Sequence, residues 1–184
     1  MTETMSTPAV TTPAPDTGAA GQPAGSTERA DLLETLRRHR FFLRHTVDGL
    51  TDSQAALRPT VSELTLARLV KHVACTERTW ARFAVEGASA FDDVDWAEEW
   101  TVHPGQTLAG LLADYADVAR RTDELVTSLP SLDLAHPLPA APWFEPGASW
   151  SARRVLLHVV AETSQHAGHA DIIRESIDGQ KTMG

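Results

Sequence analysis

Four segments of the chain have apolar residues that recur every three or four positions, which is the period of an amphipathic helix. They span about residues 28–50, 66–86, 108–130, and from 149 or 151 to 178. Between them no segment alternates convincingly between apolar and polar residues, so we expect no strands. The pattern predicts an all-α protein. Four helices of this length are typical of a four-helix bundle, in which functional sites lie between the helices.

The first 26 residues do not share this pattern. They contain four prolines and three glycines but no lysine or arginine, and such a composition cannot bury enough apolar surface to order itself. They also lack the basic start and the continuous apolar run of a secretory signal. We therefore expect a disordered tail over residues 1–26, one bundle domain over residues 27–184, and a cytoplasmic location.

The charge balance narrows the choice of partners. The chain has 25 acidic residues against 16 lysines and arginines, a formal net charge of −9, which repels phosphate backbones and anionic lipid surfaces. No apolar run approaches the roughly 18 residues that a membrane span needs. We expect a small-molecule substrate rather than nucleic acid or a membrane, and homodimer formation is left open.

Polar residues fall on the apolar side of the last predicted helix. At about 100° per residue, His158, Glu162, His166 and His169 lie within about 80° of one another, bracketed by apolar residues such as Val155. A carboxylate in a bundle core is costly unless it is paired, hydrogen-bonded or bound to a metal ion. Because glutamate and imidazole one helical turn apart can reach the same ion, Glu162 and His166 indicate a cation site.

His72 is the candidate third ligand. It lies at the edge of the apolar stripe of the helix predicted over residues 66–86, from which it can reach across to the last helix. Two histidines and one glutamate with an open position form a catalytic type of metal site. Taken alone, a histidine such as His72 on an apolar face is more commonly a hydrogen-bonded core histidine. His158 is a fourth ligand, a hydrogen-bonding partner of the ligands, or a partly exposed histidine.

Several neighbouring residues are candidates for catalysis or binding. We expect His169 to act as an acid or base in the pocket, with metal ligation as its alternative. Glu77 is a second candidate base, or else it forms an ion pair with an arginine across the bundle. Arg153 can bind a carboxylate or lie on the surface. Cys75, the single cysteine, is a soft ligand or, more commonly, a small buried thiol.

Two long connections carry aromatic residues. Residues 88–106 contain Trp96 and Trp100, and residues 130–148 contain Trp143 and Phe144. Connections of this length in a compact domain are usually functional or mobile. Their aromatic side chains either close the end of the bundle or form the walls of a pocket. In the second interpretation Trp143, with Arg153, contributes to binding a cofactor.

Two sequence stretches resemble a known family. LVKHVACTERTW, which contains His72, and LLHVVAETSQHAGHADIIRE, which contains Glu162 and His166, resemble the DinB superfamily of four-helix-bundle metalloproteins over roughly residues 28–180. The likeness is to its actinobacterial branch, typified by mycothiol-dependent maleylpyruvate isomerases and mini-circle proteins. The resemblance implies metal ligands at His72, Glu162 and His166, zinc or nickel as the metal, and mycothiol or a similar thiol as co-substrate.

These observations favour a metal-dependent, thiol-dependent transferase or isomerase that acts on a small electrophilic metabolite or toxin. In this hypothesis the metal turns the thiol into a thiolate, which is the nucleophile. The first alternative is a non-enzymatic stress or binding protein with the same metal. The second is a metal-dependent hydrolase, in which His169 or Glu77 is the base that activates water.

Overall fold

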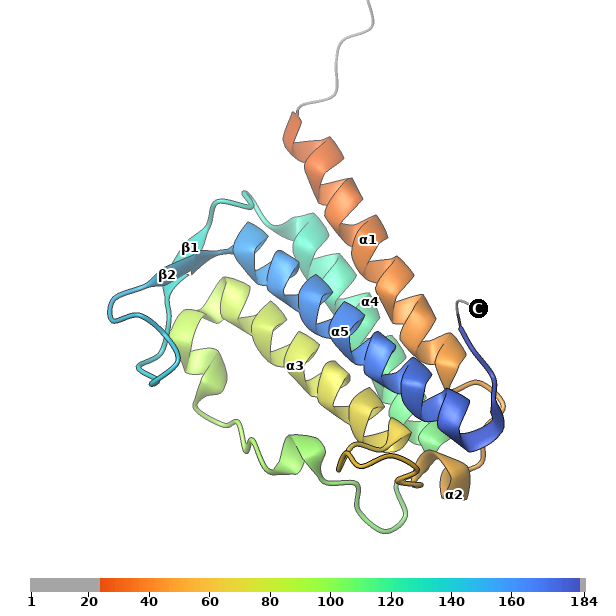
Figure 1. The fold of residues 1–184 in the computed structure, drawn as a ribbon. Coiled ribbons are helices and arrows are strands. Elements are labelled where there is room, and N and C mark those ends of the chain that lie inside the picture. The colour runs from red at the N-terminus through yellow and green to blue at the C-terminus, as the bar shows by residue number, and fades with distance from the viewer. Residues whose placement is uncertain (1–23, 183–184) are drawn as a thin grey trace, which may run out of the picture.

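A computed structural model describes residues 24–182 of the chain, and Figure 1 shows four long helices packed side by side. The helices are α1 (Ala24–Thr46), α3 (Leu66–Glu86), α4 (Leu108–Ser128) and α5 (Ala152–Asp178), with a short α2 (Asp52–Ala55) between the first two. Around the bundle the order of neighbours is α1, α5, α3, α4. The all-α prediction is confirmed. Within residues 24–182, none of the helices combines the length and apolar character needed to cross a bilayer.

The expected tail over residues 1–26 lies outside the described residues, apart from the three residues that begin α1. The starts of the later helices agree with the sequence, because polar side chains cap them. Thr65, Thr107 and Ser151 each accept a hydrogen bond from the backbone N–H three residues further on, which satisfies a donor that the helix itself leaves free. At the other end of α5, Gly179 adopts the left-handed conformation, with φ of 80°, that favours glycine.

The first helix ends earlier than its apolar pattern predicts. It stops at Thr46 rather than near Leu50, and the chain turns through Gly49, whose φ is 73°. The buried guanidinium of Arg174 on α5 donates to the carbonyl oxygens of Thr46 and Asp48, both at 2.9 Å. These bonds satisfy carbonyls at the helix end, so a residue distant in sequence fixes where α1 stops.

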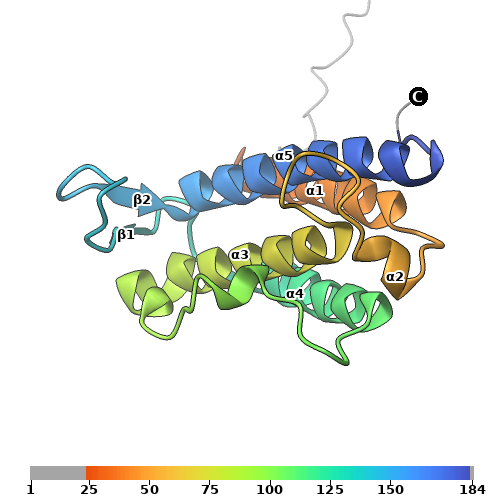
Figure 2. The same ribbon diagram turned by 60° about the horizontal axis from the view of Figure 1, so that its bottom comes forward.

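The expectation of no strands is wrong in one place. β1 (Ala135–Pro137) pairs with β2 (Ser149–Ser151) as a small antiparallel sheet, with His136 opposite Trp150. Each strand has three residues, which is too short for an alternating pattern to be recognised. The pair closes the connection between α4 and α5, and holds residues 138–148 at the end of the bundle where α5 begins (Figure 2).

A buried ion pair interrupts the apolar core. Arg40 of α1 lies between Leu36 and Leu43, which belong to two different apolar clusters. Its guanidinium donates to both carboxylate oxygens of Glu77 on α3, at 2.5 and 3.0 Å, and to Asp123 of α4 at 2.8 Å. The Glu77 side chain is fully buried. Three helices are therefore joined by one cluster of charged groups, in which Asp123 also pairs with Arg37 of α1 at 2.8 Å.

The connection from α3 to α4 runs along α3 (Figures 1 and 2) and contains two short 3₁₀ helices, η1 (Gly87–Phe91) and η2 (Glu98–Trp100). The Lys71 ammonium on α3 donates to the Glu98 carboxylate at 2.6 Å and to the Thr101 carbonyl at 2.5 Å. These bonds fix η2 against α3 at the level of the next residue, His72.

Candidate functional site

His72 of α3 and Glu162 and His166 of α5 come together between the two helices. One ligand atom from each lies within 4.8 Å of the others, and the His166 Nε2 atom is 3.6 Å from the Glu162 Oε2 atom. Tetrahedral ligands that are each about 2.1 Å from a zinc ion lie roughly 3.4 Å apart. The cluster is therefore close to the size that one ion needs, as the sequence predicts for these three residues.

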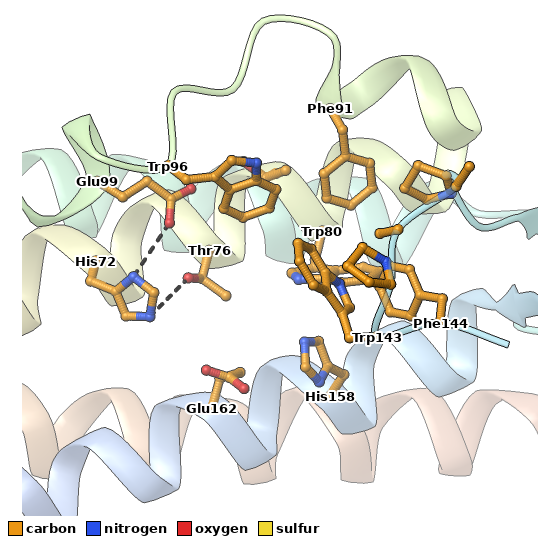
Figure 3. Close-up of a pocket in the computed structure, with 15 residues that line it drawn as sticks. His72, Thr76, Trp80, Phe91, Trp96, Glu99, Trp143, Phe144, His158 and Glu162 are labelled. Atoms are coloured by element: carbon orange, nitrogen blue, oxygen red, sulfur yellow. Dashed lines mark hydrogen bonds and ion pairs between the residues drawn. The ribbon is translucent and has the colours of Figure 1, made fainter.

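Both histidines of the cluster present the same side of the ring to it. The Nδ1 atom of His72 faces the Glu99 Oε2 atom at 3.3 Å. Its Nε2 atom lies 3.4 Å from the Thr76 hydroxyl, on the side of Glu162 (Figure 3). The Nε2 atom of His166 likewise faces Glu162, while its Nδ1 atom lies 3.3 Å from the Nδ1 atom of His169. Metal-binding histidines typically have this arrangement, with the second ring nitrogen held by another group.

The Glu99 carboxylate is nearly fully buried. Its Oε2 atom lies 3.3 Å from the Nδ1 atom of His72, and neither atom has a hydrogen-bond partner among the described residues. The Trp100 ring stacks on the His72 ring, with centroids 3.8 Å apart and planes inclined by 17°. The sequence pattern does not predict a role for Glu99. The only signal was its place in an acidic run just before Trp100, and its direction depends on how η2 is anchored to α3.

The carboxylate of the cluster is ionised at neutral pH. The hydrogen bond from His166, helped by the nearby His158 and His72, holds the pKa of Glu162 below its usual value, although partial burial opposes this shift. Burial lowers the pKa of His158, so its ring is neutral at pH 7. That ring lies edge-on to the indoles of Trp80 and Trp150, with centroids 4.7 and 5.2 Å away.

A cavity of about 450 Å³ opens beside the cluster, within the usual size range of small-molecule sites. His72, Glu99 and Glu162 line one end, and His158 lies further along the same wall (Figure 3). The largest side chains of the remaining lining are aromatic and come from α3 and the two long connections: Trp80, Phe91, Trp96, Trp143 and Phe144. Trp96, Trp143 and Phe144 thus form a pocket wall, as one interpretation of the sequence predicts.

Two residues considered for catalysis lie elsewhere. Glu77 is in the buried ion pair with Arg40, which is the alternative that the sequence offered, and it is not among the residues that line the cavity. His169 is also outside the described lining, and contacts the far side of the His166 ring. Its position suits a group that orients His166 better than one that exchanges protons with a ligand in the cavity.

Arg153 and Cys75 also lie outside the cavity lining described here. The Arg153 guanidinium is already paired with the carboxylates of Glu28 and Asp133, so a substrate carboxylate would have to displace them. Burial raises the pKa of the Cys75 thiol, which keeps it protonated at neutral pH, and Cys75 is not part of the ligand cluster. The described part of the chain therefore offers no thiolate of its own to the pocket.

Four helices around a partly buried cluster of two histidines and one glutamate, with a pocket beside it, define a DinB-like bundle. Residues 31–179 match the mycothiol S-transferase family, and the chain belongs to this DinB-like family.

One solved structure, a conserved protein from Enterococcus faecalis, is similar with a TM-score of 0.59 and 16% sequence identity. The alignment covers 87% of this chain and 100% of that one. At this identity the likeness concerns the fold alone. No curated protein matches the sequence.

Proposed function

We propose that the protein transfers a low-molecular-weight thiol of the mycothiol type to a small electrophile, with the help of a divalent metal ion. The observation that carries this proposal is the convergence of His72, Glu162 and His166 beside a pocket that His72 and Glu162 line at one end and that is rich in aromatic side chains. Membership of the mycothiol S-transferase family supports the thiol and the reaction type. Zinc suits a site of two imidazoles and one carboxylate, and nickel is the second choice.

His72, Glu162 and His166 would hold the metal ion, with the charge of Glu162 offsetting part of its charge. A bound divalent cation lowers the pKa of a thiol from about 8.5, so that thiolate is available at neutral pH. The thiol has to come from a small molecule, because Cys75 lies outside the pocket. His158 lines the cavity with a neutral imidazole, so one of its ring nitrogens can accept the proton that the thiol loses. A ligand that covers the aromatic side chains of the wall displaces the water that would compete with the thiol.

The remaining step is a substitution at the electrophile. The thiolate sulfur attacks the electrophilic carbon, a carbon–sulfur bond forms, and the leaving group departs with the electron pair of the bond that breaks. The test is the conjugation of mycothiol to 1-chloro-2,4-dinitrobenzene by metal-loaded protein. We expect conjugation that requires the thiol and stops when a chelator removes the metal. Metal-loaded protein without conjugation would favour the binding protein, and ester cleavage without thiol would favour the hydrolase.

Glu99 has a distinct role in this proposal, which is to hold the His72 ring with its Nε2 atom toward the metal. Removing such a group from behind a ligand typically costs 10–100-fold in metal affinity. We therefore expect Glu99→Ala to weaken zinc binding by about 10–100-fold, measured by competition with a chromophoric chelator. Glu99→Gln should lose less, because its amide oxygen keeps an acceptor near the Nδ1 atom of His72.

The matched control for Glu99 is its neighbour Glu98, which pairs with Lys71 and His103 instead of His72. Glu98→Ala removes a carboxylate from the same 3₁₀ helix and loosens its anchor to α3. If it weakened zinc binding as much as Glu99→Ala does, then the anchoring of the connection, and not the orientation of His72, would explain the loss.

A further inference from the structure

The cavity beside the cluster has an unusual charge balance. Its described lining includes two carboxylates, Glu99 and Glu162, but no lysine or arginine. Its remaining histidine outside the cluster, His158, is neutral at pH 7 because it is buried. A divalent ion would bring the sum of these charges to zero, and a thiolate beside it would make the sum negative. No described group of the lining is therefore left to attract an anion.

The apolar wall of the cavity increases the effect of this charge balance on a bound ligand. Most of the wall is aromatic or proline, and charges interact more strongly next to such a wall than in water. A buried anion without a partner is costly. The nearest candidate in the sequence for binding a carboxylate, Arg153, is outside the lining and is paired with Glu28 and Asp133.

The two tryptophans of the wall that come from the long connections are unusually exposed. Trp96 is 52% exposed and Trp143 is 69% exposed, although both line the cavity. Phe91 stacks on Trp96, with centroids 6.0 Å apart, and Phe144 packs edge-on against Trp143 at 6.1 Å. Large aromatic side chains that stay open to solvent around one cavity are typical of a surface that a ligand covers.

We infer that the electrophile accepted by this site is an aromatic molecule that is uncharged or cationic, and that anionic acceptors are disfavoured. Flat rings pack on the exposed faces and edges of Trp96 and Trp143, and a cationic group is further attracted by the indoles. This inference rests on the proposed function, since it names the second substrate of the same reaction. In the transfer, the thiolate displaces a leaving group such as chloride, which departs with the bonding electron pair.

A binding experiment tests the inference without any reaction. Metal-loaded protein is titrated with 3,5-dinitrobenzamide and with 3,5-dinitrobenzoate, which differ in charge but hardly in shape, and quenching of tryptophan fluorescence gives the two affinities. We expect the amide to bind about tenfold more tightly than the carboxylate. Equal affinity, or a preference for the carboxylate, would overturn the inference.

Variants locate the binding surface. Trp143→Ala should weaken binding of the amide by about fivefold, since it removes a packing surface for the ring. Phe41→Ala is the control, because Phe41 is 59% exposed on α1 and does not line the cavity. It should leave the affinity unchanged. An unchanged affinity in Trp143→Ala would mean that the amide binds elsewhere, against the inference.

A kinetic experiment separates the inference from the function on which it rests. The rate of mycothiol conjugation is measured with two acceptors, 4-chloro-3,5-dinitrobenzamide and 4-chloro-3,5-dinitrobenzoate. Each enzymatic rate is divided by the rate of the same reaction without protein. Conjugation of both at equal relative rates would leave the transferase standing and refute the acceptor preference. No conjugation, together with tighter binding of the amide, would refute the transferase and keep the preference of the cavity. A Trp143→Ala variant with a raised KM for mycothiol alone would show that the wall binds the thiol, which also refutes the inference.

Discussion

Replacing Glu162 with glutamine is expected to lower zinc affinity by more than about 100-fold, because loss of a direct ligand should exceed the 10–100-fold cost of removing a group behind one. His72→Ala should have an effect of the same size from the other helix, since its ring completes the cluster from α3. Elemental analysis and chelator competition measure both. Circular dichroism should show the same helix content as the wild type, because neither side chain belongs to the apolar clusters of the core.

Glu175→Gln is the matched control for Glu162→Gln. It makes the same chemical change on the same helix, at an exposed carboxylate that pairs with Lys181. It should leave zinc binding unchanged. Wild-type metal content in Glu162→Gln or in His72→Ala would remove that residue from the ligand set.

Replacing Arg40 with methionine is expected to destabilise the fold by about 3–5 kcal/mol, because it leaves the Glu77 carboxylate buried without a partner. Burial by itself lowers the pKa of Arg40, but its bonds to Glu77 and Asp123 raise the pKa above the ordinary value, so the Arg40 guanidinium is charged throughout the neutral range. In a domain of this size the midpoint of thermal unfolding should fall by roughly 10 °C. Urea denaturation gives the free energy of unfolding directly.

The double variant Arg40→Met, Glu77→Met tests the reason for this loss. Replacing a buried ion pair by apolar residues of similar volume is often neutral or stabilising, so the double variant should recover much of the stability that Arg40→Met loses. A loss of less than about 1 kcal/mol in Arg40→Met would show that water or another group compensates Glu77. It would also favour the alternative interpretation of Glu77 as a catalytic base.

The helices were predictable because their signals are local. The apolar period, the capping residues Thr65, Thr107 and Ser151, and the stop at Gly179 all act within a few residues of the chain. The local signal at Asp48 and Gly49 placed the end of α1 only approximately, near Leu50. The helix ends at Thr46, whose carbonyl accepts a hydrogen bond from Arg174, more than a hundred residues away. The two strands were not predicted, because a strand of three residues is too short to show an alternation of apolar and polar positions.

The candidate site shows the same division. Glu162 and His166 are one turn apart on a helix, so their convergence follows from helical geometry. For His72 to join this cluster, the only further condition is that α3 lies next to α5. By contrast, the position of Glu99 depends on the path of an irregular connection, and the partner of Glu77 depends on which arginine faces it across the bundle. No pattern in the sequence specifies such tertiary contacts.

The cluster residues and the aromatic wall residues lie on different parts of the fold. The three cluster residues stand on α3 and α5, which are rigid supports for a site that needs fixed geometry. Trp96, Trp143 and Phe144 stand on the connections, where changes of sequence disturb the bundle least. In this account the helices provide the chemistry, and the connections determine which electrophile is accepted.

The most direct test of the account is the absorption spectrum of cobalt-substituted protein during titration with mycothiol. The account predicts one cobalt ion per chain, a visible spectrum typical of a low-coordinate site, and a new near-ultraviolet sulfur-to-metal band that grows with the thiol and is absent in Glu162→Gln. A protein that binds no stoichiometric cobalt, or a cobalt spectrum that mycothiol leaves unchanged, would contradict it.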